Sequence, residues 1–193
     1  MTRTEGALGS GTLVAVVGPS GAGKDTLISE VMAHFGPRPD LHLAQRVITR
    51  PEDAGGEAHC AVDCGQFEAL KRAGHFAVEW EAHGLCYGIP AAIRDWLSRG
   101  DVVIANGSRS ALPHFAQAFE TMLVVNVVAT PDVLANRLQA RGRECRSDIL
   151  LRLQRSSLEV RGDYNVLTID NSGDLATAVA ALISALSPLL KNP

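Results

Sequence analysis

The sequence is poor in the features that mark secreted and membrane proteins. Its 193 residues include only four cysteines, and its opening segment, MTRTEGALGSG, lacks the apolar core of a secretion signal. Its continuous apolar runs, such as residues 13–17 and 123–129, are far shorter than the roughly 20 residues that span a bilayer. We therefore expect a protein of the reducing cytoplasm, without a disulfide framework and without a membrane partner.

An excess of positive charge is also missing. The chain has 18 Lys and Arg against 21 Asp and Glu, which gives a net charge of -3. No overall positive field suits the chain to nucleic acid, so we expect no nucleic-acid partner. With 46% hydrophobic and 20% charged residues, the chain has enough apolar surface for a core, which excludes intrinsic disorder. The length fits a single domain over residues 1–193.

Lysine is scarce among the basic residues. Only Lys24, Lys71 and Lys191 are lysines, which leaves fifteen arginines. A GC-rich genome would produce such a count, so the positions of the arginines carry more information than their number. Arginine matters because its planar guanidinium binds phosphate through two hydrogen bonds. Seven of the arginines fall in one stretch: Arg137, Arg141, Arg143, Arg146, Arg152, Arg155 and Arg161.

Histidine and cysteine residues in the middle of the chain suggest a zinc site at first sight. Their spacing matches no common Cys-x2-Cys pattern, and Cys60 and Cys64 lie in an alternating stretch that is typical of a strand. We therefore do not expect zinc there. The residues concerned are His59, Cys60, Cys64, His83 and Cys86.

Apolar runs alternate with amphipathic stretches along the chain, which predicts an α/β fold with a parallel sheet. Strands are expected over residues 12–17, 43–49, 58–62, 76–80, 101–105, 123–129 and 166–169. Helices are expected over residues 25–35, 67–73, 90–99, 110–119, 130–140, 147–160 and 175–186. The turn-rich middle of the chain is predicted to form a small lobe of its own.

The strongest pattern is a glycine-rich segment between the first strand and the first helix. Glycines let successive backbone amides face a phosphate chain, the helix N-terminus adds positive potential, and a lysine reaches the outer phosphates. A chance glycine turn would not have a strand and a helix on its two sides, so we expect ATP to bind here. The segment fits GxxxxGK and consists of Gly18, Pro19, Ser20, Gly21, Ala22, Gly23 and Lys24.

The residue after this lysine differs from the usual pattern. Ser or Thr normally stands there and holds Mg2+, whereas this chain has Asp25 followed by Thr26. We expect the Thr26 hydroxyl to lie near the metal, with Asp25 as a second candidate, and both residues to belong to the ATP site.

The arginine-rich stretch predicts a lid over the reacting phosphates. Phosphoryl transfer spreads negative charge over oxygen atoms, and arginines that close on them stabilise the charge and exclude water. The candidate catalytic residues are therefore Lys24, Arg137, Arg141, Arg143 and Arg152. The alternative is a solvated helical face whose arginines pair with nearby acidic residues. Those acidic residues are Glu144, Asp148 and Glu159.

Several segments resemble the guanylate kinase-like branch of the P-loop nucleotide kinases. They are GPSGAGKDT, ITRP with a downstream GGE, FAVEW ending in YG, and RLQARGRE with ILLRL, and they extend from about residue 12 to 170. The resemblance implies a three-layer α/β/α P-loop kinase with a parallel core sheet over 12–36, 91–136 and 156–193. It also implies an inserted acceptor-binding lobe over 37–90 and a helical, arginine-rich lid over 137–155. The acceptor-site residues that it implies are Thr49, Arg50, Glu57, Glu79, Tyr87 and Gly88.

The acceptor lobe departs from the guanylate kinase pattern. The second arginine of that family's TRxPR motif is missing, because ITRP runs into Glu52 and Asp53, and the segment after GE is shortened to AHCAVD. The distal strand, which usually carries Asp residues, is followed here by Asn106, Gly107, Ser108 and Arg109. Together RVITRP, GGEAH, AHGLCYGIP and NGSR resemble the ribose 1,5-bisphosphate phosphokinases. This implies ATP-dependent phosphorylation of ribose 1,5-bisphosphate to 5-phosphoribosyl 1-diphosphate (PRPP) and ADP during phosphonate catabolism.

An acceptor with two phosphates and no base requires cations rather than a base-reading pocket. The candidates are Arg46, Arg50, His59, His83 and Arg109, with Asn106 beside them. The two histidines are equally well explained as structural residues.

Glu79 is also consistent with GMP as the acceptor, although its carboxylate would equally suit ribose hydroxyls or solvent. Guanylate kinase activity is therefore one alternative function. A non-catalytic interaction module is another, and the intact phosphate loop argues against it. For partners, we expect a small-molecule substrate and keep a homodimer open.

Overall fold

The computed structural model describes residues 11–51, 58–140 and 159–191, and its centre is a five-stranded sheet. The strand order is β2-β7-β1-β8-β9, and every neighbouring pair is parallel. Continuous apolar residues form the inner strands because both faces of a parallel sheet are covered. The strands are β1 (Thr12–Val17), β2 (Leu41–Ala44), β7 (Val102–Asn106), β8 (Met122–Val128) and β9 (Asn165–Asp170).

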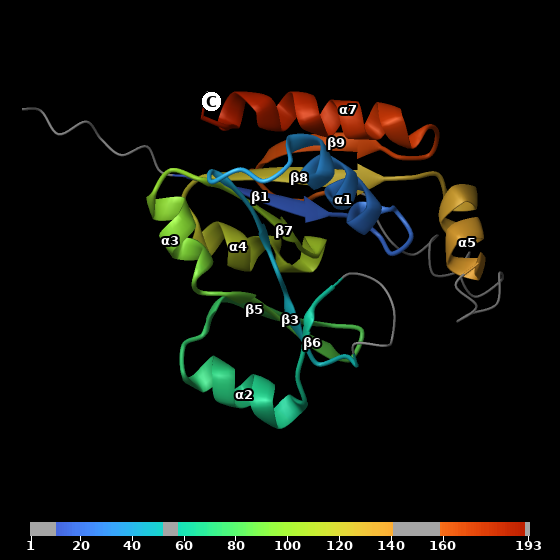
Figure 1. Ribbon diagram of the computed structural model, residues 1–193. Coiled ribbons are helices and arrows are strands. Elements are labelled where there is room, and N and C mark those ends of the chain that lie inside the picture. The colour runs from blue at the N-terminus through green and yellow to red at the C-terminus, as the bar shows by residue number, and fades with distance from the viewer. Residues whose placement is uncertain (1–10, 52–57, 141–158, 192–193) are drawn as a thin grey trace, which may run out of the picture.

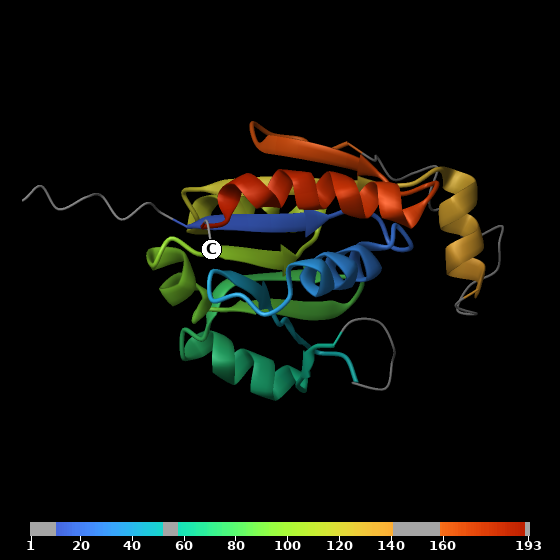
Figure 2. The ribbon, with the colours of Figure 1, turned by 45° about the horizontal axis from the view of Figure 1, so that its top comes forward.

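Helices cover both faces of this sheet, which confirms the expected three-layer α/β/α fold (Figure 1). On one face, α1 (Lys24–Phe35) and α7 (Leu175–Leu186) lie side by side (Figure 2). On the other face lie α3 (Ile93–Ser98) and α4 (Leu112–Ala118), the latter preceded by the 3₁₀ turn η2 (Arg109–Ala111). Helix α5 (Pro131–Ala140) follows β8, and the 3₁₀ turn η3 (Ser187–Leu189) follows α7.

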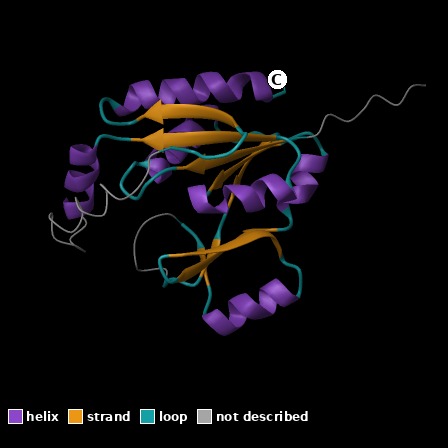
Figure 3. Ribbon diagram, turned by 180° about the vertical axis from the view of Figure 1, so that it is seen from behind, coloured by secondary structure: helices purple, strands orange, loops and turns teal. Residues whose placement is uncertain are grey.

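A second, four-stranded sheet projects from the α4 side (Figure 3). Its order is β4-β3-β6-β5, and it carries helix α2 (Cys64–Arg72) on its outer face around a small core of Val47, Phe67 and Phe76. Asp63 caps α2, and its side chain and that of Gln66 bond reciprocally to each other's backbone. The strands are β3 (Val47–Ile48), β4 (Cys60–Ala61), β5 (Phe76–Ala82) and β6 (Leu85–Pro90).

The predicted elements differ from the structure at several places. The strand expected over 43–49 is divided at Gln45 and Arg46 between β2 of the central sheet and β3 of the second sheet. Strand β6 was not predicted, because Gly88 and Pro90 are poor strand residues. Gly88 is required there, since a Cβ atom would lie 2.5 Å from the ring of Phe76. The helix expected from residue 90 accordingly begins at Ile93, and the helix expected over 147–160 falls largely outside the described residues.

A network of charged residues closes the amino edge of the central sheet. The buried Asp101 carboxylate accepts hydrogen bonds from His42 Nε2 (3.0 Å) and Lys191 Nζ (2.8 Å). Arg38 bonds both oxygens of Asp40 at 2.9 and 3.0 Å, and the Lys191 amide adds a third bond. The hydrogen bond from Arg38 lowers the pKa of Asp40 to about 2. Burial raises the pKa of Asp101, but its hydrogen bonds to Lys191 and His42 outweigh burial and lower it overall.

None of the helices in the part of the chain that the structure describes is long and apolar enough to cross a membrane.

Candidate active site

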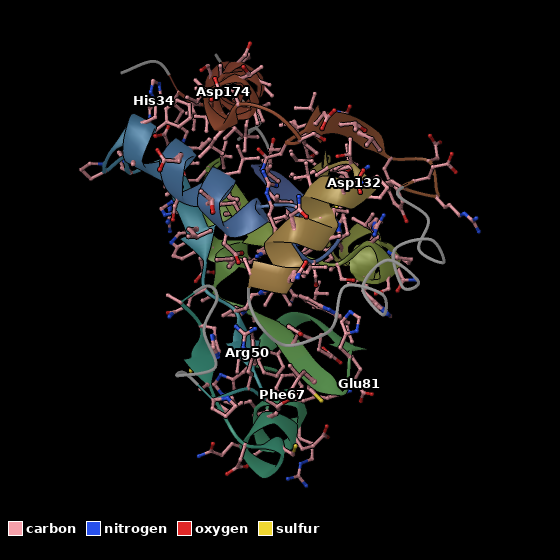
Figure 4. All side chains as sticks on the ribbon, turned by 90° about the vertical axis from the view of Figure 1, so that its right-hand side faces the viewer. His34, Arg50, Phe67, Glu81, Asp132 and Asp174 are labelled. Carbon is pink, nitrogen blue, oxygen red and sulfur yellow. The ribbon has the colours of Figure 1, made fainter. Side chains whose placement is uncertain are left out.

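The loops that follow the parallel strands all meet at the carboxyl edge of the central sheet, where ligands bind in open α/β folds. Figure 4 faces this edge, with Asp132 of α5 near the central sheet and Arg50 in the second sheet below it. The glycine-rich segment follows β1, residues 107–109 follow β7, Asn171 follows β9, and Arg46 follows β2. Residues far apart in the sequence are therefore gathered at one edge.

The glycine-rich segment has a backbone that other residues could not adopt without strain. Gly18, Gly21 and Gly23 have φ angles of 148°, 87° and 88°. A Cβ atom on Gly18 would also lie 2.1 Å from the carbonyl oxygen of Val127. Lys24, the first residue of α1, folds back over the loop, and its Nζ donates to the carbonyl oxygens of Gly18 (3.0 Å) and Pro19 (3.2 Å). This is the cradle of amides and ammonium that a polyphosphate requires.

Two side chains support this loop from behind. Arg137 of α5 donates to the carbonyl oxygens of Gly21 and Ala22, each at 3.4 Å, and to that of Asn171 at 2.9 Å. The buried Asn171 donates its Nδ2 to the carbonyl of Ala22 at 2.7 Å. These hydrogen bonds from Arg137 and Asn171 to backbone carbonyl oxygens stabilise the conformation of the glycine-rich segment. Arg137, named as a lid residue from the sequence, is therefore placed against the phosphate loop.

A pocket of about 550 Å³ opens beside the first turn of α1. Asp25, Thr26 and Asn106 line it together with residues of β2. Asn106, at the end of β7, donates its amide to the Asp25 carboxylate at 2.5 Å and so orients it. A carboxylate and a hydroxyl are hard oxygen ligands of the kind that Mg2+ prefers, usually together with phosphate oxygens. Among the described residues, no group of three or more His, Cys, Asp or Glu is placed to hold a metal ion.

Arg50, in the bend that follows β3, is held by the buried His59, which directly precedes β4. The ring Nε2 lies 3.0 Å from the carbonyl oxygen of Arg50, and the ring Nδ1 lies 3.3 Å from its guanidinium. Because a carbonyl only accepts and a guanidinium only donates, we assign His59 as neutral with its proton on Nε2. The guanidinium is therefore held by His59, while its buried Nε–H has no acceptor in the described part of the chain.

Two further arginines follow neighbouring strands of the central sheet. Arg46 lies over the rings of Tyr87 and Trp80, with Cζ at 5.2 and 6.0 Å from their centroids. Arg109 begins the turn after β7, and burial lowers the pKa of its guanidinium. Since β2 and β7 are adjacent, both arginines follow neighbouring strands on the same side of β1 at the carboxyl edge.

No family model matches the chain, but curated relatives match it over nearly its whole length. Ribose 1,5-bisphosphate phosphokinase PhnN of Agrobacterium fabrum is 59% identical over 174 residues, which cover 90% of this chain and 95% of that protein. The chain belongs to the ribose 1,5-bisphosphate phosphokinase family. The protein of the same name from Rhizobium etli is 54% identical over 180 residues, 93% of this chain and 91% of the relative.

Solved structures similar to this family member show the fold. A guanylate kinase from Anaplasma phagocytophilum matches with a TM-score of 0.66 at 15% identity, over 95% of this chain and 88% of that one. A sugar kinase from Janibacter sp. HTCC2649 matches with a TM-score of 0.54 at 16% identity, over 94% and 99% of the two chains. The guanylate kinase-like P-loop fold that the sequence motifs implied is therefore confirmed.

Other predicted site residues of this phosphokinase family member lie apart from the edge or have structural partners. Thr49 Oγ1 accepts the backbone N–H of Cys86 at 2.8 Å. His83 is exposed in the hairpin turn between β5 and β6, where its φ of 54° and the 73° of Gly84 fit the turn of a two-residue loop. Four predicted residues lie outside the described residues: Glu57, Arg141, Arg143 and Arg152.

Glu79 lies on the other face of the second sheet. Trp80 is the cross-strand partner of Tyr87, so these two share a face and Glu79 points to the opposite one. There Glu79 pairs with Lys71 of α2 at 3.3 Å, in a separate pocket of about 450 Å³ between α2, β5 and α4. The structure therefore does not bring Glu79 together with Arg46 and Tyr87.

Asn171 is the site residue that reasoning from the sequence missed in this phosphokinase. Its buried Oδ1 has no hydrogen-bond partner among the described residues, while its Nδ2 holds the phosphate loop. The available signal was its position directly after a parallel strand, at the edge where ligands bind.

Proposed function

We propose that this chain transfers the γ-phosphoryl group of ATP to the 1-phosphate of ribose 1,5-bisphosphate, which gives PRPP and ADP. The observation that carries the proposal is the 59% identity to a ribose 1,5-bisphosphate phosphokinase over 95% of that protein's length. Arginines on the acceptor side of the sheet edge support it independently, because a bisphosphate is recognised by guanidinium groups.

The phosphate loop is the proposed ATP site. Its backbone amides, the start of α1 and Lys24 would bind the β- and γ-phosphates, and Arg137 and Asn171 keep the loop in shape. For Mg2+, the Thr26 hydroxyl and the oriented Asp25 carboxylate are the proposed protein ligands. Bound Mg2+ supplies neutralisation of the charge that develops on the phosphates.

On the acceptor side, an oxygen of the 1-phosphate attacks the γ-phosphorus. The new P–O bond forms as the bond from the γ-phosphorus to the β–γ bridging oxygen breaks, and ADP leaves with that electron pair. Because the attacking oxygen is already anionic, no general base is required, and alignment and charge neutralisation are sufficient. Arg50 and Arg109 are the proposed ligands of the attacking phosphate.

Arg141, Arg143 and Arg152 are proposed to close over the transferring group from the lid segment 137–155. The support for this role is their place in the sequence, next to the described Arg137. Removal of Arg141 or Arg143 should then lower kcat with little change in substrate binding.

The proposed function is tested with a panel of acceptors and ATP at saturating Mg2+. We expect PRPP and ADP in equal amounts with ribose 1,5-bisphosphate, and no ADP with GMP. If PRPP does not exceed that of a Lys24→Ala control, the proposal is wrong. Rapid ADP formation with GMP would instead identify a guanylate kinase, and the absence of any ATP-induced rise in Tm would favour a non-catalytic module.

Cytoplasmic location, the absence of a nucleic-acid partner and a homodimer remain predictions. Light scattering of the purified protein measures the last of these directly.

A further inference from the structure

The face of the second sheet that carries Tyr87 has a platform made of two aromatic rings. Trp80 and Tyr87 are cross-strand partners, and their rings are stacked with centroids 5.2 Å apart and planes 7° apart. Phe115 of α4 contacts Trp80, with a centroid distance of 5.7 Å. Two nearly parallel, stacked rings supported in this way present an aromatic face on which a nucleobase can stack.

The platform is covered by a guanidinium of the chain itself. Arg46 Cζ lies within cation–π distance of both rings, at 5.2 Å from the Tyr87 centroid and 6.0 Å from that of Trp80. Trp80 is only 7% exposed, so little of its surface is left for a ligand. The backbone of Arg46 is fixed too, because its carbonyl oxygen accepts the N–H of Cys60 at 2.8 Å. The arginine therefore occupies the platform.

Two kinds of acceptor differ at the position that Arg46 would contact. In a nucleoside monophosphate, the ribose links the reacting phosphate to a planar base, whereas in ribose 1,5-bisphosphate it links the reacting phosphate to a second phosphate. A bare aromatic platform favours the base. A guanidinium that lies on the platform removes the stacking surface and offers a planar set of N–H donors that phosphate can accept in pairs.

We propose that Arg46, whose guanidinium lies within cation–π distance of Trp80 and Tyr87, is a specificity-determining residue that binds the 5-phosphate of ribose 1,5-bisphosphate and excludes nucleobases. The inference rests on the proposed function, since it assigns one end of that substrate. It divides the acceptor site in two, with Arg50, oriented by His59, at the reacting phosphate and Arg46 at the distant one.

A thermodynamic cycle tests this assignment. Binding of ribose 1,5-bisphosphate and of ribose 1-phosphate, which lacks the 5-phosphate, is measured by calorimetry for the wild-type protein and for Arg46→Ala. In the wild type, loss of the 5-phosphate should weaken binding roughly 10- to 100-fold, as expected for a charge-assisted bond. In Arg46→Ala the two ligands should bind within about threefold of each other. Arg72→Ala, which removes an exposed arginine from α2 of the same lobe, should keep the full wild-type ratio.

The exclusion of bases is tested with Trp80 as a fluorescent reporter. Because the chain has two tryptophans, Trp96→Phe leaves Trp80 alone. GMP and AMP should not change Trp80 emission in this background, and should quench it once Arg46→Ala is added. Arg46→Lys keeps the charge without the planar guanidinium, so it should retain most of the 5-phosphate effect while admitting nucleotides. Arg46→Gln, which removes the charge but keeps a long side chain, replaces Arg46→Ala if that variant does not fold.

The outcomes separate this inference from the proposed function. If the wild type forms no PRPP, the function itself is wrong and the inference fails with it. If the wild type forms PRPP but Arg46→Ala keeps the full 5-phosphate effect, the function holds and Arg46 is not the residue that binds this phosphate. Unchanged Trp80 emission with nucleotides in both Arg46→Ala and Arg46→Lys overturns the exclusion of bases.

Discussion

The two edges of the central sheet use charged residues in different ways. At the amino edge, carboxylates bind cations of the same chain: Asp101 contacts His42 and Lys191, and Asp40 contacts Arg38. At the carboxyl edge, the described contacts of the cations are with carbonyl oxygens, aromatic rings and a neutral histidine. Contacts of the second kind orient a cation through backbone dipoles and aromatic ring faces. We infer that the amino edge serves stability and the carboxyl edge serves binding.

The largest effect should come from Lys24. Lys24→Ala removes the ammonium that is folded over the phosphate loop, and we expect kcat/KM to fall about 10³-fold, as for loss of one preorganised charged group. The Tm without ligand should change little. Steady-state kinetics measure the effect, with Lys71→Ala, an exposed lysine paired with Glu79, as the matched control. A similar loss of activity in both variants would show that Lys24 has no special role in binding the phosphates.

Arg50→Ala should affect the acceptor rather than ATP. We expect the KM for ribose 1,5-bisphosphate to rise about 10- to 100-fold and the KM for ATP to change less than twofold, because the guanidinium is held by His59 beside the second sheet rather than by the phosphate loop. His59→Asn, which releases the arginine without removing it, should give a smaller rise of the same kind. Equal effects on the two substrates would show that Arg50 does not belong to the acceptor side.

At the amino edge, Asp101→Asn should lower stability and leave catalysis unchanged. The substitution removes a buried charge that faces Lys191, Arg99 and His42, and we expect a loss of about 2 kcal/mol in the free energy of unfolding. Urea denaturation measures this loss, and Asp95→Asn on the exposed side of α3 is the control. A fall in kcat without a fall in stability would contradict the assignment of this edge.

The smallest effect should be the acid sensitivity contributed by Asp40. Its pKa lies at about 2 in the folded protein, below its usual value of 3.8, so its stabilising effect is fully present above pH 3.8. This contribution, about 1 to 2 kcal/mol, is lost as the pH falls from 3.8 towards 2. The comparison of unfolding free energy between pH 5 and pH 2 in the wild type and Asp40→Asn isolates it. Parallel curves would show that the Arg38 bond does not stabilise the fold.

Much of the fold was predictable because its signals are local. The apolar run at residues 12–17, the glycines after it and the helix that begins at Lys24 fix the phosphate loop by spacing alone. Strand β6 was not predictable, since only the packing of Phe76 against Gly88 explains why a glycine belongs in a strand. The division of 43–49 between two sheets likewise depends on which partner strands are present.

The candidate site was predictable as a list of residue types and less so as an arrangement. Arg46 and Tyr87 were both expected at the acceptor, but the position of the guanidinium within cation–π distance of two rings depends on strand pairing across the hairpin. The same pairing places Glu79 on the face opposite Tyr87, where it contacts Lys71. Alternation along one strand could not predict this, because it does not show which face of the neighbouring strand carries Tyr87. Arg137 and Asn171 are 34 positions apart, and only the folded chain brings them to the back of one loop.

The short connection between β2 and β3 has a mechanical consequence. Only Gln45 and Arg46 separate a strand of the large sheet from a strand of the small one. If the small sheet tilts relative to the large one, the backbone must bend at these two residues, one of which is Arg46. A ligand that binds the Arg46 guanidinium would therefore bind at the connection between the two sheets.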